Sequence, residues 1–320
     1  VLGSWTVFWG FEITHSNPQR LTSETGPWPT DLNRGGGVTA VGHNLKFINL
    51  VFHDLASGIS VWSESVDTEV YGSLFFYNGW QGGDGSHGHG IYTQNQVGRR
   101  LLLENILFDQ FSHGIHAYGS ADAYLDNMIF QGNIAFNNGI IGSSGFERDI
   151  LLGGGRVAKN GVLNENYTYG GAHTYVGYGA GCQNGTVTKN YFVGRDPFLL
   201  EDCEPLLTGN SFYGLLAPVD GYGQLPVLYP DNVFHNQRPT TNVVAVRPNQ
   251  YERGRGHVVI YNWEGQGLVS VDLAPLGLQP GEGYEIRDAQ NYFGAPVAGG
   301  TYTGSLIQIP MHGLTRQAAI

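Results

Sequence analysis

The sequence is poor in charged residues, and positive charge is especially scarce. Only 13% of the 320 residues are charged, and 16 Lys and Arg residues, three of them Lys, stand against 27 Asp and Glu residues, for a net charge of −11. A nucleic-acid-binding surface needs clustered Lys and Arg residues that neutralise phosphates. The composition therefore argues against nucleic acid as a partner, although a local group of Arg and His residues can still bind an acidic polymer.

Long apolar segments and cysteine pairs are missing as well. No run approaches the roughly 20 apolar residues of a membrane helix, so we expect no membrane partner. The opening residues, VLGSWTVFWG, show neither the charged segment nor the cleavage site of a signal peptide. The two cysteines, Cys182 and Cys203, lack CxxC partners, which argues against structural zinc. A disulfide between them would fit the secreted or periplasmic location that we expect, and two buried thiols are the alternative.

Glycine and aromatic residues are abundant instead. The chain contains 49 Gly, 18 Tyr and 16 Phe residues, a composition that suits many turns between short strands better than long helices. We therefore predict an all-β protein. Because an overlooked repeat leads to the wrong fold, internal similarity is the next feature to consider.

Three segments share a Gly-Ile pair followed by an alternating run: LASGISVW at 55–62, SHGHGIYTQ at 86–94 and FSHGIHAYG at 111–119. Short alternating segments of this kind predict strands with one buried face. The alignment is anchored on these isoleucines and continues more weakly along the chain, with anchors at Ile59, Ile91, Ile115, Ile150, Tyr175 and Phe198.

A second repeated signature is an Asn shortly before aromatic or β-branched residues. Asn tolerates left-handed backbone and its amide can bond neighbouring coils, so stacked Asn residues are suited to a corner. One such unit per coil predicts a parallel β-helix, whereas a β-propeller would show four strands per period of about 40 residues. The signature occurs at Asn49, Asn105, Asn127, Asn164, Asn190, Asn210 and Asn232.

The HGIY and HGIH segments with the Asn corners resemble right-handed parallel β-helix proteins of the pectate-lyase-like superfamily, over roughly residues 36–238. That resemblance implies the scaffold more strongly than an activity, because the superfamily includes polysaccharide lyases, glycoside hydrolases, epimerases and phage tailspikes. It implies a polysaccharide as the partner.

The character of the sequence changes near residue 240. The following strands are separated by the turn signals EGQG and QPGEG and carry no Ile anchor, which predicts a small antiparallel β-sandwich. We expect a β-helix over 1–239 and a sandwich over 240–320, similar to accessory domains of carbohydrate-active enzymes. We expect the N-terminal coil to be incomplete, and an open first coil would favour end-to-end association.

The anchors also align the polar residues of successive coils, which lie about 4.8 Å apart in a sheet. The anchor and the position two residues later are apolar or small, so we expect them to face inward. The other positions then face outward together and form a groove. We expect the substrate to be bound there by His89, Trp62, Gln94, Tyr118, His173, Tyr178 and Glu201.

Four residues of this groove are candidates for catalysis by β-elimination of a uronate-containing glycan. In this hypothesis Arg148 neutralises the uronate carboxylate, and His113 or His116 abstracts the C5 proton. Tyr92 or Tyr118 protonates the leaving oxygen. His suits the role because its usual pKa lies near neutral pH.

Several alternatives stay open at this point. Glycoside hydrolysis is the nearest, but neither an Asp-Asp pair nor an Arg-x-Lys motif accompanies the GHG at 88–90. A glycan-binding protein without activity and a self-assembling structural protein are two others. We expect no cofactor, although His87, His89, His113 and His116 leave a divalent metal open.

Overall fold

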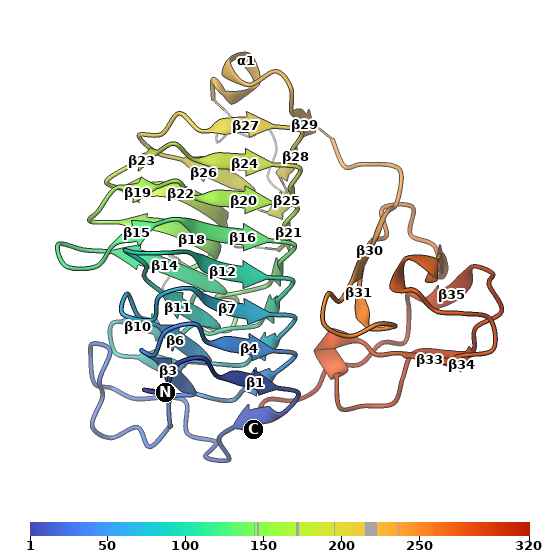
Figure 1. The fold of residues 1–320 in the computed structure, drawn as a ribbon, viewed down its shortest axis with the longest axis horizontal. Helices are drawn as coiled ribbons and strands as arrows, with labels where there is room; N and C mark the ends of the chain where they lie inside the picture. The colour runs from blue at the N-terminus through green and yellow to red at the C-terminus, as the bar shows by residue number, and fades with distance from the viewer. Residues whose placement is uncertain (144, 146, 171–172, 195, 215–222, 236) are drawn as a thin grey trace. The chain divides into compact units, whose positions relative to one another are not determined.

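The computed structural model describes residues 1–320 except 144, 146, 171–172, 195, 215–222 and 236. The fold is all-β, with long parallel sheets and several small antiparallel ones (Figure 1). The chain forms two compact units, residues 1–237 with Ile320 and residues 238–319. Each unit is described by itself below.

Three parallel sheets make up most of the first unit. Sheet 1 contains β1 (Val7–Trp9), β4 (Lys46–Ile48), β7 (Thr68–Tyr71), β12 (Arg100–Leu103), β16 (Met128–Gln131), β20 (Val162–Asn164), β24 (Thr186–Thr188) and β27 (Leu206–Thr208). Sheet 2 contains β2 (Glu12–Thr14), β5 (Val51–His53), β8 (Leu74–Phe76), β13 (Ile106–Phe108), β17 (Ile134–Phe136), β21 (Tyr167–Tyr169), β25 (Tyr191–Gly194), β28 (Ser211–Gly214) and β29 (Val233–His235). Sheet 3 contains β3 (Val38–Ala40), β6 (Ile59–Val61), β11 (Ile91–Thr93), β14 (Ile115–Gly119), β18 (Arg148–Gly154), β22 (His173–Gly179) and β26 (Phe198–Leu200).

The chain passes through the three sheets in turn, and each full passage is called a circuit here. A strand of each circuit pairs in parallel with the equivalent strand of the next, so that Ile59, Ile91 and Ile115 lie in register. Figure 1 shows the circuits stacked in chain order. Smaller pairings belong to the same unit: a parallel sheet of β15 (Leu125–Asp126), β19 (Ala158–Lys159) and β23 (Cys182–Gln183), and a hairpin of β9 (Trp80–Gly82) and β10 (Gly85–His87). The short helix α1 spans Leu225–Leu228.

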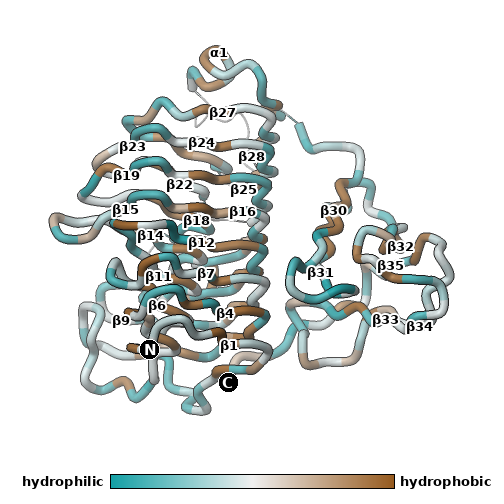
Figure 2. Tube along the Cα trace, in the orientation of Figure 1, coloured by the Kyte–Doolittle hydropathy of each residue, from teal (hydrophilic) through white to brown (hydrophobic). Residues whose placement is uncertain are grey.

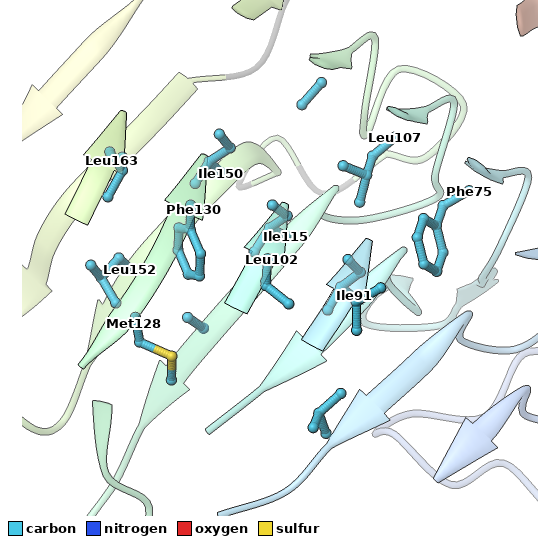
Figure 3. Packing of buried hydrophobic residues seen from close by; sticks show 14 of the residues in the cluster. Phe75, Ile91, Leu102, Leu107, Ile115, Met128, Phe130, Ile150, Leu152 and Leu163 are labelled. Carbon is cyan, nitrogen blue, oxygen red and sulfur yellow. The ribbon is translucent and has the colours of Figure 1, made fainter. Parts of the chain in front are cut away.

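The core of the first unit lies between the three sheets. Successive side chains of a strand point to opposite faces, and brown and teal segments accordingly alternate along the stacked circuits (Figure 2). Phe75, Ile91 and Leu102, which come from the three different sheets, are all 0% exposed. Figure 3 shows such apolar side chains from successive circuits gathered in one cluster. The predicted Ile anchors therefore face inward at Ile59, Ile91, Ile115 and Ile150, each 0% exposed.

A continuous ladder of asparagine amides runs along the turns that lead into sheet 2. In this ladder each Oδ1 after the first accepts both the main-chain N–H and the Nδ2–H of the Asn one circuit earlier, at 2.8 to 3.1 Å. The same Nδ2 groups also donate to main-chain carbonyls. The members are Asn105, Asn133, Asn166, Asn190, Asn210 and Asn232.

The sequence signature located this ladder only in part. Asn133 and Asn166 take the places that Asn127 and Asn164 were expected to fill, because the ladder residue directly precedes a sheet 2 strand. Asn127 adopts a left-handed backbone at another corner, with φ of 55°, and Asn164 lies on β20. Asn49 is also left-handed, with φ of 54°.

Cys182 and Cys203 form a disulfide with a Cα–Cα distance of 4.9 Å. The bridge links two successive circuits. Of the two states that the sequence left open, a disulfide and a pair of buried thiols, the structure contains the disulfide. None of the helices in the described part of the chain has the length and hydrophobicity needed to cross a bilayer.

The second unit consists of three two-stranded antiparallel sheets around a small apolar core. The pairs are β30 (Val243–Pro248) with β31 (Gly256–Tyr261), β32 (Leu268–Val271) with β35 (Ile307–Pro310), and β33 (Gly283–Ile286) with β34 (Ala298–Thr301). Two short 3₁₀ helices, η2 (Ala274–Leu276) and η3 (Ala289–Asn291), join them. Val271, Leu273 and Tyr302 are among the most buried core residues.

Replacing one buried member of the amide ladder tests its contribution to stability. Asn166→Ala removes the acceptor of two hydrogen bonds from Asn133 and the donor to Phe130 O and to Asn190 Oδ1, so four hydrogen bonds between buried groups are lost. We expect a loss of about 2 to 4 kcal/mol in the free energy of unfolding. Urea denaturation measures it, with Gln183→Ala on the exposed side of β23 as the control. Equal effects of the two substitutions would contradict the ladder's role.

Candidate functional site

The outward face of sheet 3 carries the residues that the sequence singled out. Between the inward Ile91 and Thr93, Tyr92 points outward, and it lies in register with Ser60 on one side and His116 on the other. Both Tyr92 and His116 are half-buried, whereas the residues on either side of them are buried. A row of polar and aromatic side chains therefore crosses neighbouring strands on one face.

The register departs from the prediction at β22. Ile150 pairs with Thr174, which is 0% exposed, so the inward anchor of this circuit is Thr174 and the predicted anchor Tyr175 is wrong. The cause is an irregularity in the pairing of β18 with β22, where the residue between Arg148 and Ile150 is skipped. As a result Tyr175 faces outward, opposite Leu151. A second shift before Gly153 restores the predicted alignment of Tyr118 with Tyr178.

Three imidazoles form a cluster at the centre of this face. His89 Nε2 and His116 Nδ1 are 2.9 Å apart, and the rings of His113 and His116 lie 4.3 Å apart between centroids. The main-chain N–H of His113 points at His89 Nδ1 over 3.4 Å, and that of Arg148 donates to His113 Nδ1 over 3.0 Å. The structure thus brings together His89, His113 and His116, which lie on two successive circuits.

These hydrogen bonds fix the positions of the imidazole protons. His113 Nδ1 accepts from the main chain, so the proton of a neutral His113 ring is on Nε2. The contact from the His113 main chain favours the same tautomer for His89, whose Nε2–H then donates to His116 Nδ1. His116 in turn carries its proton on Nε2. His113 and His116 therefore both present an Nε2–H group as a hydrogen-bond donor.

Burial keeps the three rings uncharged. It lowers the pKa of His89 to about 3, with the nearby His87 adding to the effect. Burial also lowers the pKa of His113 well below its usual value, and the electrostatic effects of His89 and Arg148 add to this in smaller measure. The pKa of His116 is likewise lowered by burial, then by His89 and His113. At neutral pH the cluster is a set of neutral donors beside one cation.

That cation is Arg148. Its guanidinium lies 5.5 Å from the centre of the Tyr175 ring, and its Nη1 donates to Glu147 O over 2.7 Å. Its Nε is buried and bonds none of the described residues. Burial lowers the pKa of Arg148, but at neutral pH it stays charged. Arg148 therefore keeps donors for an anionic group.

Tyr175 and Glu201 form a pair next to this cation. The Tyr175 hydroxyl donates to Glu201 Oε2, which also accepts from the Gly179 main chain over 3.3 Å. Burial, followed by the hydrogen bond to Glu201, raises the pKa of Tyr175 to about 12. The sequence did not predict Tyr175 as a site residue, because Tyr175 was expected to be an inward-facing anchor. The two-residue spacing from His173, a predicted outward residue, was the signal that could have found it.

Aromatic side chains extend the face on the side where the strands end. The rings of Trp62 and Tyr92 lie 5.4 Å apart, and those of His116 and Tyr118 lie 5.2 Å apart. Gln94 Nε2 donates to the Tyr92 hydroxyl over 3.0 Å, and Gln94 itself is 7% exposed. Burial raises the pKa of Tyr92, so its hydroxyl stays protonated.

The remaining predicted residues lie on the later circuits of the same sheet. Tyr178 is 41% exposed, and its ring lies 5.3 Å from that of Tyr175. His173 pairs with Arg148 in register, and its Nδ1 lies 2.8 Å from Asp196 O. Tyr178 and Glu201 thus lie beside Tyr175, whereas His173 bonds the next circuit.

The described residues contain no group of three or more His, Cys, Asp and Glu side chains that could hold a metal ion. The hydrogen bonds of the cluster are those of neutral rings that bond each other and the main chain.

No protein-family model, curated protein or solved structure matches this chain at a significant level. Function must therefore be inferred from the chemistry of the face itself.

A buried carboxyl group lies directly behind this face. Asp149, the skipped residue of β18, is 0% exposed, and its Oδ1 accepts from Asn138 Nδ2 over 2.8 Å. Asn138, Gln110 and Asn78 form a second, shorter amide ladder that leads to it. Asp149 Oδ2 is buried and bonds no described residue. Burial raises the pKa of Asp149 from 3.8 to about 8, so the carboxyl is protonated at neutral pH.

This carboxyl makes the stability of the fold depend on pH. Because the folded-state pKa is above the unfolded one, its contribution is fully present below pH 4 and is lost as pH rises towards 8. We expect Asp149→Asn, which mimics the protonated form, to stabilise the protein by about 2 to 5 kcal/mol at pH 8 and by much less at pH 4. Denaturant titrations at both pH values measure this, with the exposed Asp122→Asn as the control. A gain independent of pH would contradict the assignment.

Proposed function

We propose that the first unit is a right-handed parallel β-helix of the pectate-lyase-like type, and that the second unit is a β-sandwich accessory domain. Three parallel sheets visited in turn, with an amide ladder at one corner, support the first assignment. The three antiparallel pairs around one core support the second. The disulfide supports a secreted or periplasmic protein.

On this scaffold we propose that the face of sheet 3 binds a uronate-containing polysaccharide and cleaves it by β-elimination. The observation that carries the proposal is that the cation Arg148 lies one circuit after the imidazole cluster, bonds His113 through its main chain and acts on the His113 ring through its charge. A cation and neutral donors on one face suit the carboxylate of a uronate. The aromatic residues Trp62, Tyr92 and Tyr118 provide surfaces on which sugar rings can stack.

The elimination requires that the C5 proton become more acidic. Arg148, His113 and His116 lower its pKa by stabilising the negative charge that develops on the uronate carboxylate in the transition state. Tyr92, kept protonated by burial, or Tyr118 then supplies a proton to the leaving oxygen. The sequence predicts His113 or His116 as the group that abstracts the proton, and abstraction needs an unprotonated nitrogen. The Nδ1 atoms of both rings are hydrogen-bonded, which places the proton of each ring on Nε2. The base is then a group outside this cluster.

Binding without cleavage is the second candidate function. It is favoured by one observation, namely that the Nδ1 atoms of His89, His113 and His116 all take part in hydrogen bonds within the protein. Hydrolysis has less support, because Glu201, the carboxylate among the predicted groove residues, is held by Tyr175.

A panel of plant, algal and bacterial polysaccharides tests these functions. We expect one or more uronate polymers to yield both unsaturated products, detected by ultraviolet absorbance, and new reducing ends. Arg148→Ala should lower kcat/KM about 100-fold or more, since the carboxylate loses its cation. Arg99→Ala, an exposed arginine next to sheet 1, is the matched control and should have no effect.

The outcomes of this screen separate the functions. Reducing ends without unsaturated products would show hydrolysis instead of elimination. Glycan binding that Arg148→Ala abolishes, without any product, would show a binding protein. Neither product nor binding on a wide panel would contradict the proposed function altogether.

A further inference from the structure

We infer that His87, paired with Asp84, is the general base of the elimination. This inference rests on the proposed function and adds a residue that lies outside the three-imidazole cluster. The two residues belong to the hairpin β9–β10, which the chain inserts between sheet 2 and sheet 3 just before His89. The alignment of circuits gave His87 no equivalent, because this hairpin occurs in one circuit and not in its neighbours.

The hairpin holds the His87 ring in one orientation. His87 and Trp80 are opposite each other in its antiparallel pairing, and their rings stack at 5.2 Å with an interplanar angle of 16°. The preceding segment of the chain adds to the support, since the Gln81 main chain bonds Arg20 and Thr22. His87 is therefore positioned by its stack on Trp80, in a hairpin whose other strand bonds the preceding segment.

Asp84 fixes the tautomer of His87. His87 Nε2 lies 2.8 Å from Asp84 Oδ1, while Asp84 Oδ2 accepts from the Gly26 main chain over 2.9 Å. A carboxylate acceptor places the imidazole proton on Nε2, so Nδ1 carries a free electron pair. Within the described part of the chain no hydrogen bond to Nδ1 is present. This is the reverse of His113, whose Nδ1 is occupied and whose Nε2 carries the proton.

The hairpin also lies next to the proposed site. His87 and His89 are separated by one residue, Gly88, whose left-handed backbone, with φ of 84°, turns the chain into sheet 3. On the adjacent side, Ser86 Oγ accepts from the Ser143 main chain over 2.8 Å, five residues before Arg148. The hairpin is thus tied to the segments that lead to both His89 and Arg148.

The elements around His87 carry five charged or titratable groups, of which Arg20, on the segment that bonds Gln81, is paired with Asp54. Asp84 is on its own hairpin and His89 follows it in the chain. Glu24 belongs to the segment that bonds the hairpin at Gly83, and Glu147 lies on the segment after Ser143. Glu24 is engaged with Thr30, and His89 is uncharged. Asp84 is the group that bonds His87 directly and stabilises its charged form.

The chemical step is balanced with these groups. His87 Nδ1 takes the proton from C5 of the uronate, and the electron pair of the C–H bond forms the C4–C5 double bond. The C4–O bond breaks with its pair on the leaving oxygen, which takes a proton from Tyr92 or Tyr118. Asp84 stabilises the resulting His87 imidazolium until it releases its proton to water, and the tyrosinate takes a proton from water, which restores both groups.

His87→Gln and Asp84→Asn test this assignment on the full chain, with the polymer that the wild-type protein cleaves. We expect His87→Gln to lower kcat about 100-fold or more while glycan affinity and melting temperature stay near those of the wild type. Asp84→Asn should lower kcat about 10-fold and move the acidic limb of the kcat/KM profile to lower pH, because the imidazolium loses its carboxylate. Asp122→Asn is the matched control with an unchanged profile.

Two results would overturn the inference. A His87→Gln variant with wild-type kcat would remove His87 as the base and leave the proposed elimination intact. A variant in which kcat, affinity and melting temperature all fall together, with an unchanged pH profile for Asp84→Asn, would show that the pair only braces the hairpin. Absence of elimination by the wild-type protein would instead refute the proposed function, and the base assignment with it.

Discussion

In-register parallel pairing between successive circuits is the constraint on which the rest of this structure depends. A shift by one residue would exchange the inward and outward faces of a strand. The register is held on the inside by stacked apolar residues such as Ile91 and Ile115, and at the corner by amides that bond both the main chain and each other. Because the amides are buried, a shifted circuit would leave their polar groups without partners. The same register determines which outward side chains of sheet 3 lie next to each other on successive strands.

The same main chain that holds the sheets together also determines the chemistry of the imidazoles. Main-chain N–H groups of Arg148 and His113 point at the Nδ1 atoms of the preceding circuit. The main chain therefore determines which ring nitrogen of His89 and His113 carries the proton. His113 and His116 are donors at the centre of the face, and His87 is an acceptor on the adjacent hairpin. The three are the same residue type and differ in the hydrogen-bond partner of the ring.

The sequence predicted most of the features that repeat, with two of the ladder residues misplaced, and missed two features that occur once. All-β structure, the Ile anchors and the inward-outward alternation follow from residues that recur in each circuit, and the structure confirms them. The outward placement of Tyr175 could not be predicted, because it depends on a skipped residue in the pairing of two strands. The pairing of His87 with Asp84 was missed for the same reason. It depends on a hairpin and on a main-chain bond to Gly26, far away in the sequence.

The hairpin β9–β10 has a wider consequence for how such a protein can change. It lies in a turn that takes no part in the three long sheets, so residues can be added to or removed from it without altering the register of any circuit. The proposed base therefore lies in a part of the chain that takes no part in the register, whereas the imidazole cluster and Arg148 depend on it. The group that takes the proton can therefore be exchanged together with one turn, while the buried core and the outward rows of sheet 3 stay the same.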